Sequence, residues 1–184
     1  MLNARPIVNI DVGDLAEKLK DDSLFGEFSF RKEKYAHTDM KDIWVRYNHI
    51  DMIGERFNDE HSSVWYPVAH KLPEAVIICA QLMALVNGER LGGVLITKLP
   101  PGCEIKPHID KGWHAEYYQK YFVPIANEKG AVFGFEDGNI EPMPGEVWEF
   151  DNSVPHWVKN DSNSDRIAMI VCIKTFASGL NDIS

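Results

Sequence analysis

Short apolar runs separated by turn residues, at intervals of roughly ten residues, occupy the second half of this 184-residue chain. This spacing is typical of a β-sandwich or barrel, in which each run is a strand and each polar cluster turns the chain. The predicted strands are 93–99, 104–109, 117–125, 131–136, 146–149, 156–159 and 166–175. The pattern therefore limits this part of the chain to a mainly β fold.

The first 90 residues have a mixed pattern of helix and strand signals. The strongest is a helix over 72–87, with Pro73 in its first turn, an apolar stripe that includes Ile78 and Leu82, and Asn87 followed by glycine as its stop. Weaker signals predict strands at 6–12, 25–31 and 42–47 and a short helix at 13–20. The whole pattern predicts an α+β, mainly β chain: a double-stranded β-helix (jelly roll) with N-terminal helices packed on one sheet.

The chain has no linker-like stretch, so we expect one domain over residues 1–184. Within it, 1–90 is predicted to be a mixed α/β support region, and 91–176 a jelly-roll core that carries the functional site.

Composition narrows the partners and the compartment. Hydrophobic residues make up 45% of the chain, which is enough for a core, and the net charge of −9 argues against broad binding to nucleic acid. No apolar run is long enough to span a bilayer, and the first residues lack a secretory signal. Three cysteines without a CxxC pair fit a reducing environment. We therefore expect a cytoplasmic protein without nucleic-acid or membrane partners.

Two candidate metal ligands stand together at the end of a predicted strand. His108 and Asp110 are two residues apart, so their side chains would share a face, and imidazole with carboxylate is a common pair for a divalent metal. The third ligand is either His114, which follows Gly112, or His156, which begins a later strand. Two histidines and one acid would form a facial triad with open positions, as in non-haem Fe(II) oxygenases.

Arg166 favours His156 over His114 as the third ligand. A polar cluster, NDSNSD, separates His156 from Arg166. A hairpin centred there would place the two residues nearly opposite one another on neighbouring strands. The guanidinium would then stand beside the metal and could hold the far carboxylate of a chelating dicarboxylic acid.

The runs LPPGCEIKPHID, YYQKYFVPI and PGEVWEFDNSVPHWVKNDSNSDRIAMIV carry a resemblance to a known family. Together they resemble the aspartyl/asparaginyl β-hydroxylase-like 2-oxoglutarate- and Fe(II)-dependent oxygenases, which belong to the cupin, or double-stranded β-helix, superfamily. The resemblance implies a metal held by His108, Asp110 and His156, and 2-oxoglutarate held by Arg166. It also implies Fe(II), 2-oxoglutarate and O2 as cofactor and co-substrates.

One segment departs from the family pattern. The family often has Arg-x-His before the strand that reads Val-Pro-Ile here, whereas this chain has Lys120-Tyr121-Phe122. Lysine keeps the charge but lacks the planar fork of arginine. Lys120, with Tyr118 on the same side of the predicted strand, is expected to contact the co-substrate.

Substrate-binding residues are expected close to the metal ligands. Trp113, His114 and Tyr121 follow the His108–Asp110 pair, and Asn152 precedes His156, where it could touch substrate or shape a turn. Arg46 and Arg90 could reach a substrate carboxylate, although solvent exposure is favoured for both.

The leading hypothesis is a 2-oxoglutarate-dependent dioxygenase that hydroxylates an amino-acid side chain, free or within a peptide or protein. The resemblance favours an Asp- or Asn-like side chain. One alternative is a non-catalytic cupin-type protein that binds a metal and a ligand. Another is a metal-dependent isomerase or hydrolase on the same fold, because fold alone does not determine function.

Overall fold

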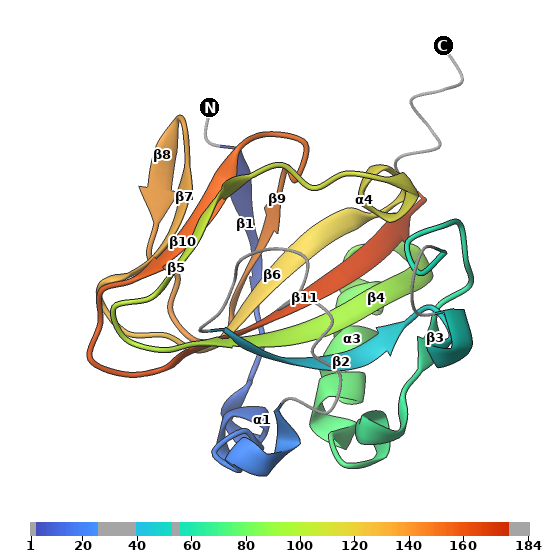
Figure 1. Cartoon of the computed structure of the whole chain (residues 1–184), viewed down its shortest axis with the longest axis horizontal. Helices are drawn as coiled ribbons and strands as arrows, with labels where there is room; N and C mark the ends of the chain where they lie inside the picture. The colour runs from blue at the N-terminus through green and yellow to red at the C-terminus, as the bar shows by residue number, and fades with distance from the viewer. Residues whose placement is uncertain (1–2, 26–39, 53–55, 177–184) are drawn as a thin grey trace.

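Two antiparallel β-sheets face each other in the computed structural model, which describes residues 3–25, 40–52 and 56–176 (Figure 1). The larger sheet has seven strands in the order β1-β9-β6-β11-β4-β2-β3, and the smaller has four in the order β5-β10-β7-β8. The strands are β1 (Ala4–Asn9), β2 (Lys41–Tyr47), β3 (Val64–Trp65), β4 (Gly88–Leu99), β5 (Glu104–His108), β6 (Gln119–Ala126), β7 (Ala131–Phe135), β8 (Gly138–Ile140), β9 (Glu146–Phe150), β10 (His156–Asn160) and β11 (Arg166–Thr175). The predicted jelly roll is confirmed.

The helices lie mainly against the outer face of the large sheet (Figure 1). They are α1 (Gly13–Lys18), α3 (Pro73–Leu85) and α4 (Trp113–Tyr117), with short 3-10 turns η1 (Asp22–Leu24), η2 (Ile50–Met52) and η3 (Pro67–His70). Leu15 from α1 and Leu82 from α3 belong to one buried cluster with Val123 and Met169 of the sheet. The prediction that N-terminal helices pack on one sheet is therefore confirmed.

The alternation of the large sheet separates two cores. Along β11, Ile167, Met169 and Val171 face the helices, whereas Arg166 and Ala168 face the space between the sheets. That inner space is lined mainly by aromatic and branched side chains: Leu99, Ile105, Phe122, Phe133, Phe135, Phe150 and Val158. A polar side chain on this inner face is therefore held inside the barrel.

Most predicted elements match the observed ones within a few residues, with four differences. β4 begins at Gly88, earlier than the strand predicted from residue 93. The strand expected to begin at residue 117 begins at Gln119, because the preceding residues form α4. The two shortest strands, β3 and β8, were not predicted. The strand predicted at 25–31 falls almost entirely outside the described residues.

The predicted hairpin between His156 and Arg166 is wrong. β10 pairs with β5 and β7 in the small sheet, whereas β11 pairs with β4 and β6 in the large sheet. The polar cluster between them carries the chain from one sheet to the other. Its first residue, Asn160, is fully buried and holds this crossing in place through the hydrogen bonds of its side chain. Its amide donates to the carbonyls of Leu99 and Ser164 at 2.8 and 2.9 Å, and its oxygen accepts from the Ser162 hydroxyl at 2.6 Å.

Replacing Asn160 with alanine is expected to lower the free energy of unfolding by about 3 kcal/mol, because it leaves buried carbonyl groups without donors. Urea unfolding followed by circular dichroism measures the change. Asn163→Ala, at an exposed position in the same turn, is the matched control and should change stability by less than about 0.5 kcal/mol. Equal losses of stability for the two variants would contradict this structural role of Asn160.

Within the described residues, no helix combines the length and the hydropathy needed to cross a membrane.

Candidate metal centre

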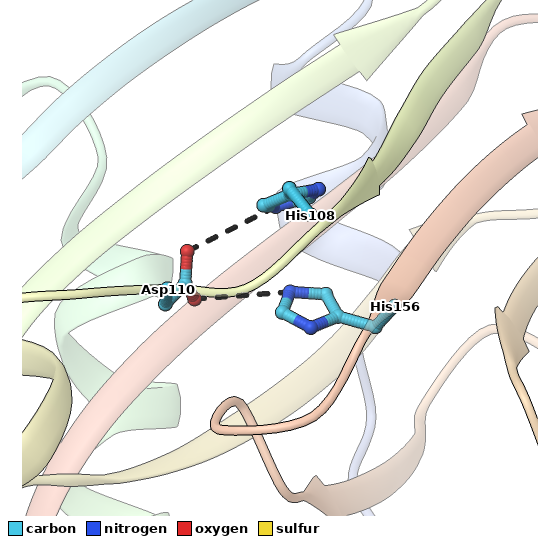
Figure 2. Close-up of side chains that lie close together, drawn as sticks. All are labelled: His108, Asp110 and His156. Carbon is cyan, nitrogen blue, oxygen red and sulfur yellow. Dashed lines mark ion pairs between the residues drawn. The ribbon is translucent and has the colours of Figure 1, made fainter.

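Three side chains converge where β5 ends and β10 begins (Figure 2). His108 ends β5 and His156 begins β10, and the two are directly paired across these strands. The Nε2 atoms of His108 and His156 lie 3.8 Å from Oδ1 and Oδ2 of Asp110, respectively. One ligand atom from each residue falls within 4.8 Å of the other two. The structure therefore brings together the three residues that were predicted as metal ligands.

The hydrogen bonds of the two imidazoles fix which nitrogen is available. Nδ1 of His108 lies 2.8 Å from the carbonyl of Lys106, and Nδ1 of His156 lies 2.9 Å from that of Val154. A carbonyl only accepts, so each Nδ1 carries a proton and donates it, and Nε2 is the nitrogen that a metal can bind. Burial also lowers the pKa of His156, which favours the neutral form that binds metals. Two imidazoles and a carboxylate suit a divalent metal, so the residues fit the predicted iron.

Asp110 lies beyond the end of β5 and is positioned by the loop that precedes His156. The Asp110 N–H donates to the carbonyl of Asn152 at 3.1 Å. The Asn152 amide donates in turn to the carbonyl of Ala115 in α4 at 3.0 Å. Asn152 thus joins the loop, Asp110 and α4. Of the two roles that the sequence allowed for Asn152, touching substrate or shaping a turn, these contacts fit the second.

Lys120 faces the same space from the inner side of β6. Its ammonium group forms an ion pair and hydrogen bond with Oδ2 of Asp110, the oxygen that also faces His156. The lysine at the position where the family often has arginine therefore lies directly beside the candidate metal ligands.

Arg166 is deeply buried, with 3% of its surface exposed. Its guanidinium carbon lies 4.9 Å from the centre of the Phe122 ring. Phe122 packs on Phe133, which in turn packs on His156. Burial lowers the Arg166 pKa to about 9. A buried cation of this kind is costly unless an anion pairs with it.

The phenylalanine at position 122 occupies the place where the family often has histidine. It gives the Arg166 guanidinium an aromatic face, a favourable arrangement for a buried cation. This departure from the family pattern therefore alters the surroundings of Arg166 rather than the metal ligands.

His114 lies in the packing between α4 and β4. It is buried, and its Nε2 accepts a hydrogen bond from the Gly93 N–H at 3.0 Å. Its ring also packs against Tyr47 and Tyr118. Burial lowers its pKa to about 3, so the ring stays neutral. These contacts engage His114 in fixing α4, away from the three converging ligand atoms.

The other aromatic candidates lie in two places. Trp113 stacks on Tyr117 on the partly exposed side of α4. Tyr118 is buried, and its ring packs against His114 and Tyr117. Tyr121 faces the helices and belongs to the outer core, so the structure does not bring it to the ligands.

Two contributors to the site region were not identified from the sequence. His61 is buried and stacks on His114 with ring centres 5.5 Å apart. Arg46, expected to be exposed, is half-buried and donates to the carbonyls of Leu91 and Gly92 at 3.3 and 3.1 Å. His61 lies outside the helices and strands, where no periodic pattern signals a contact, whereas Arg46 lies in β2, whose pairing with β4 brings it to Leu91 and Gly92.

Comparison with known families decides the class of the protein. A sequence model of the aspartyl/asparaginyl beta-hydroxylase family matches residues 20–175. The chain belongs to this family. Membership confirms the resemblance seen in the sequence and the prediction of a 2-oxoglutarate-dependent oxygenase. Together with the cluster of His108, Asp110 and His156, membership in the β-hydroxylase family supports Fe(II), 2-oxoglutarate and O2 as cofactor and co-substrates.

Solved structures resemble this β-hydroxylase family member in fold. An oxidoreductase of the 2OG-Fe(II) oxygenase family from Burkholderia pseudomallei superposes with a TM-score of 0.61 at 10% identity, covering 94% of this chain and 84% of its own. A Pseudomonas putida prolyl-4-hydroxylase gives 0.55 at 13% identity, with 89% and 84% covered. The viral collagen prolyl hydroxylase of Paramecium Bursaria Chlorella virus-1 gives 0.50 at 11%, with 95% and 96% covered. A comparison with curated proteins finds no match.

Proposed function

We propose that this protein is a 2-oxoglutarate- and Fe(II)-dependent hydroxylase of an amino-acid side chain, with aspartate or asparagine as the favoured residue. One observation carries the proposal. The three ligand atoms of His108, Asp110 and His156 share an aromatic-lined interior with Arg166, a buried cation with no carboxylate partner within the described residues. A divalent metal beside a buried guanidinium suits a dicarboxylic acid that chelates at one end and is clamped at the other.

Each residue has a distinct part in this proposal. The Nε2 atoms of His108 and His156 and the carboxylate of Asp110 would hold the iron. When bound, the iron supplies the redox chemistry in which O2 oxidises 2-oxoglutarate to succinate and CO2 and inserts its second oxygen atom into a substrate C–H bond. Arg166 would bind the far carboxylate of 2-oxoglutarate through its planar fork. Lys120 would neutralise negative charge next to Asp110.

The walls of the site serve to exclude water. The His156 ring packs against Phe133, Phe135 and Phe150 at centroid distances of 6.0, 6.4 and 5.4 Å. An apolar lining strengthens the electrostatic contacts of Arg166 and keeps water from competing with the reaction.

The substrate side of the proposal rests on the family name. Two of the similar structures are prolyl hydroxylases, a name that describes their own substrates. At 13% and 11% sequence identity, their similarity to this chain supports a shared fold and does not identify its substrate. We therefore favour an Asp- or Asn-like side chain, in a free amino acid, a peptide or a protein. A cytoplasmic location and a single functional domain complete the proposal.

Succinate formation tests the proposal. Purified protein with Fe(II), ascorbate and 2-oxoglutarate should release succinate slowly on its own and faster with an accepted substrate, whose mass rises by one oxygen atom. Amino acids and short peptides containing aspartate or asparagine form the first screen. Iron bound at one equivalent without any succinate formation would overturn the proposal and favour the non-catalytic ligand-binding alternative.

A further inference from the structure

The inner face of the large sheet carries cationic side chains beyond those already discussed. On β11 this face alternates from Arg166 at one end to Lys174 at the other. Lys120 of β6 is paired with Cys172, and Lys174 is paired with Arg90 of β4. Lys174 is two residues beyond Cys172, so the Lys174–Arg90 pair stands about 7 Å along the strand from the Lys120 position.

Tyr117 of α4 holds these two cations together. The Lys174 ammonium lies 5.2 Å from the centre of the Tyr117 ring, and the Arg90 guanidinium carbon lies 5.9 Å from it. Trp113 stacks on the same ring at 5.0 Å, with 20° between the planes. We call Arg90, Lys174 and Tyr117 the cationic mouth. Because Trp113 follows Asp110 by three residues, α4 links the cationic mouth to the metal ligands.

The charges of the cationic mouth have no counter-ion within the described part of the chain. Arg90 donates to the Ser62 hydroxyl at 2.7 Å. The charge of Glu60 contributes to raising the Arg90 pKa, but Glu60 forms no ion pair with Arg90. Elsewhere, by contrast, Lys98 and Lys159 are paired with carboxylates. Like charges directly opposite each other on neighbouring strands are destabilising. The chain has a net charge of −9, yet these two neighbouring cations have no counter-ion among the described residues. This arrangement therefore indicates a site at which a bound anion would stabilise the protein.

A buried donor lies beside the cationic mouth. Tyr118 is 2% exposed, and its hydroxyl has no hydrogen-bond partner within the described residues. Burial raises the Tyr118 pKa, while the charge of Arg90 is near enough to act in the opposite direction. A buried hydroxyl without a partner is uncommon in folded proteins. A bound anion at the cationic mouth would supply a nearby acceptor.

We infer that the cationic mouth binds a carboxylate of the substrate, separate from the group that is hydroxylated, and thereby favours substrates that carry such a carboxylate. The inference rests on the proposed hydroxylase function and specifies its substrate class. The carboxylate is either the free α-carboxylate of an amino acid or an acidic side chain next to the target residue in a peptide. A substrate anchored there extends from the cationic mouth past Lys120 toward the metal ligands.

Paired probes test the inference and separate its two sources. One pair is L-asparagine and L-asparaginamide, which differ in the α-carboxylate. The other is acetyl-Gly-Asn-Glu-amide and acetyl-Gly-Asn-Gln-amide, which differ in the acidic side chain. Each is titrated calorimetrically into the protein loaded with Fe(II) and 2-oxoglutarate in the absence of O2. In at least one pair, the carboxylate-bearing member should bind on the order of tenfold more tightly.

The variant Arg90→Gln/Lys174→Gln should abolish this difference. A matched control, Lys129→Gln/Lys159→Gln, removes the same charge from an exposed loop and an exposed strand position and should retain it. Equal affinities within both pairs, no measurable binding of any probe, or discrimination that survives in the Arg90/Lys174 variant would each overturn the inference. Succinate formation without substrate, measured on the same preparations, reports on the proposed function separately.

Discussion

Replacing His156 with alanine should reduce Fe(II) affinity by on the order of 100-fold or more. His156 supplies one of three converging ligand atoms, and its Nδ1 bond to the Val154 carbonyl fixes the ring so that Nε2 faces Asp110. Loss of a partner that merely orients a ligand typically costs 10–100-fold in metal affinity, so loss of the ligand itself costs at least about as much.

Anaerobic calorimetric titration with Fe(II) measures this effect. His156→Leu is the companion variant, because it fills the space between Phe133 and Phe150 without restoring a ligand. His70→Ala is the matched control, since it removes an exposed histidine from η3. Near-unchanged Fe(II) affinity in both His156 variants, with circular dichroism showing a native fold, would remove His156 from the metal centre.

The cluster of His108, Asp110 and His156 could be predicted because its signals are local or tied to strand ends. His108 and Asp110 are two residues apart, and His156 begins a strand, so each was placed at the edge of an element without knowledge of the whole fold. The structure adds how Asp110 is held, through the backbone carbonyl of Asn152. No side-chain pattern reveals a contact made by a main-chain carbonyl.

The neighbourhood of Arg166 was predicted only in part. Its inward orientation follows from strand alternation, but the sequence placed it on a hairpin with His156. A polar run of six residues is compatible both with a hairpin turn and with a crossing between sheets. The choice depends on Asn160 reaching the Leu99 carbonyl, a contact between residues 61 positions apart. Sequence patterns within one segment do not contain that information.

The short helix α4 was missed for a related reason. It has five residues, too few for a helical period, and it starts after Gly112, whose φ of 94° suits glycine. Tertiary contacts hold it in place, chiefly the hydrogen bond from the Gly93 N–H to His114. As a result, His114 and Tyr118, which were predicted to contact substrate and co-substrate, also pack α4 against β4.

The second large effect is expected at Arg166. Arg166→Met should retain Fe(II) but weaken 2-oxoglutarate binding by on the order of 100-fold or more, because a buried guanidinium–carboxylate pair depends on both partners. Arg166→Lys keeps the charge without the planar fork and should fall between the wild type and Arg166→Met. Anaerobic titration of 2-oxoglutarate into the Fe(II)-loaded protein measures all three. Arg56→Met, at an exposed position, is the control and should bind 2-oxoglutarate normally.

Arg166→Met, although it weakens 2-oxoglutarate binding, should not destabilise the protein when the co-substrate is absent. Arg166 is buried with an aromatic contact and without a carboxylate partner in residues 3–25, 40–52 and 56–176. Replacing an unpaired buried charge by an apolar side chain of similar length removes a desolvation penalty, so the melting temperature of Arg166→Met should equal or exceed that of the wild type. Added 2-oxoglutarate and Fe(II) should then raise the melting temperature of the wild type far more than that of the variant. An Arg166→Met protein that loses stability without ligand, yet binds 2-oxoglutarate with wild-type affinity, would show that Arg166 is structural and that another cation holds the co-substrate.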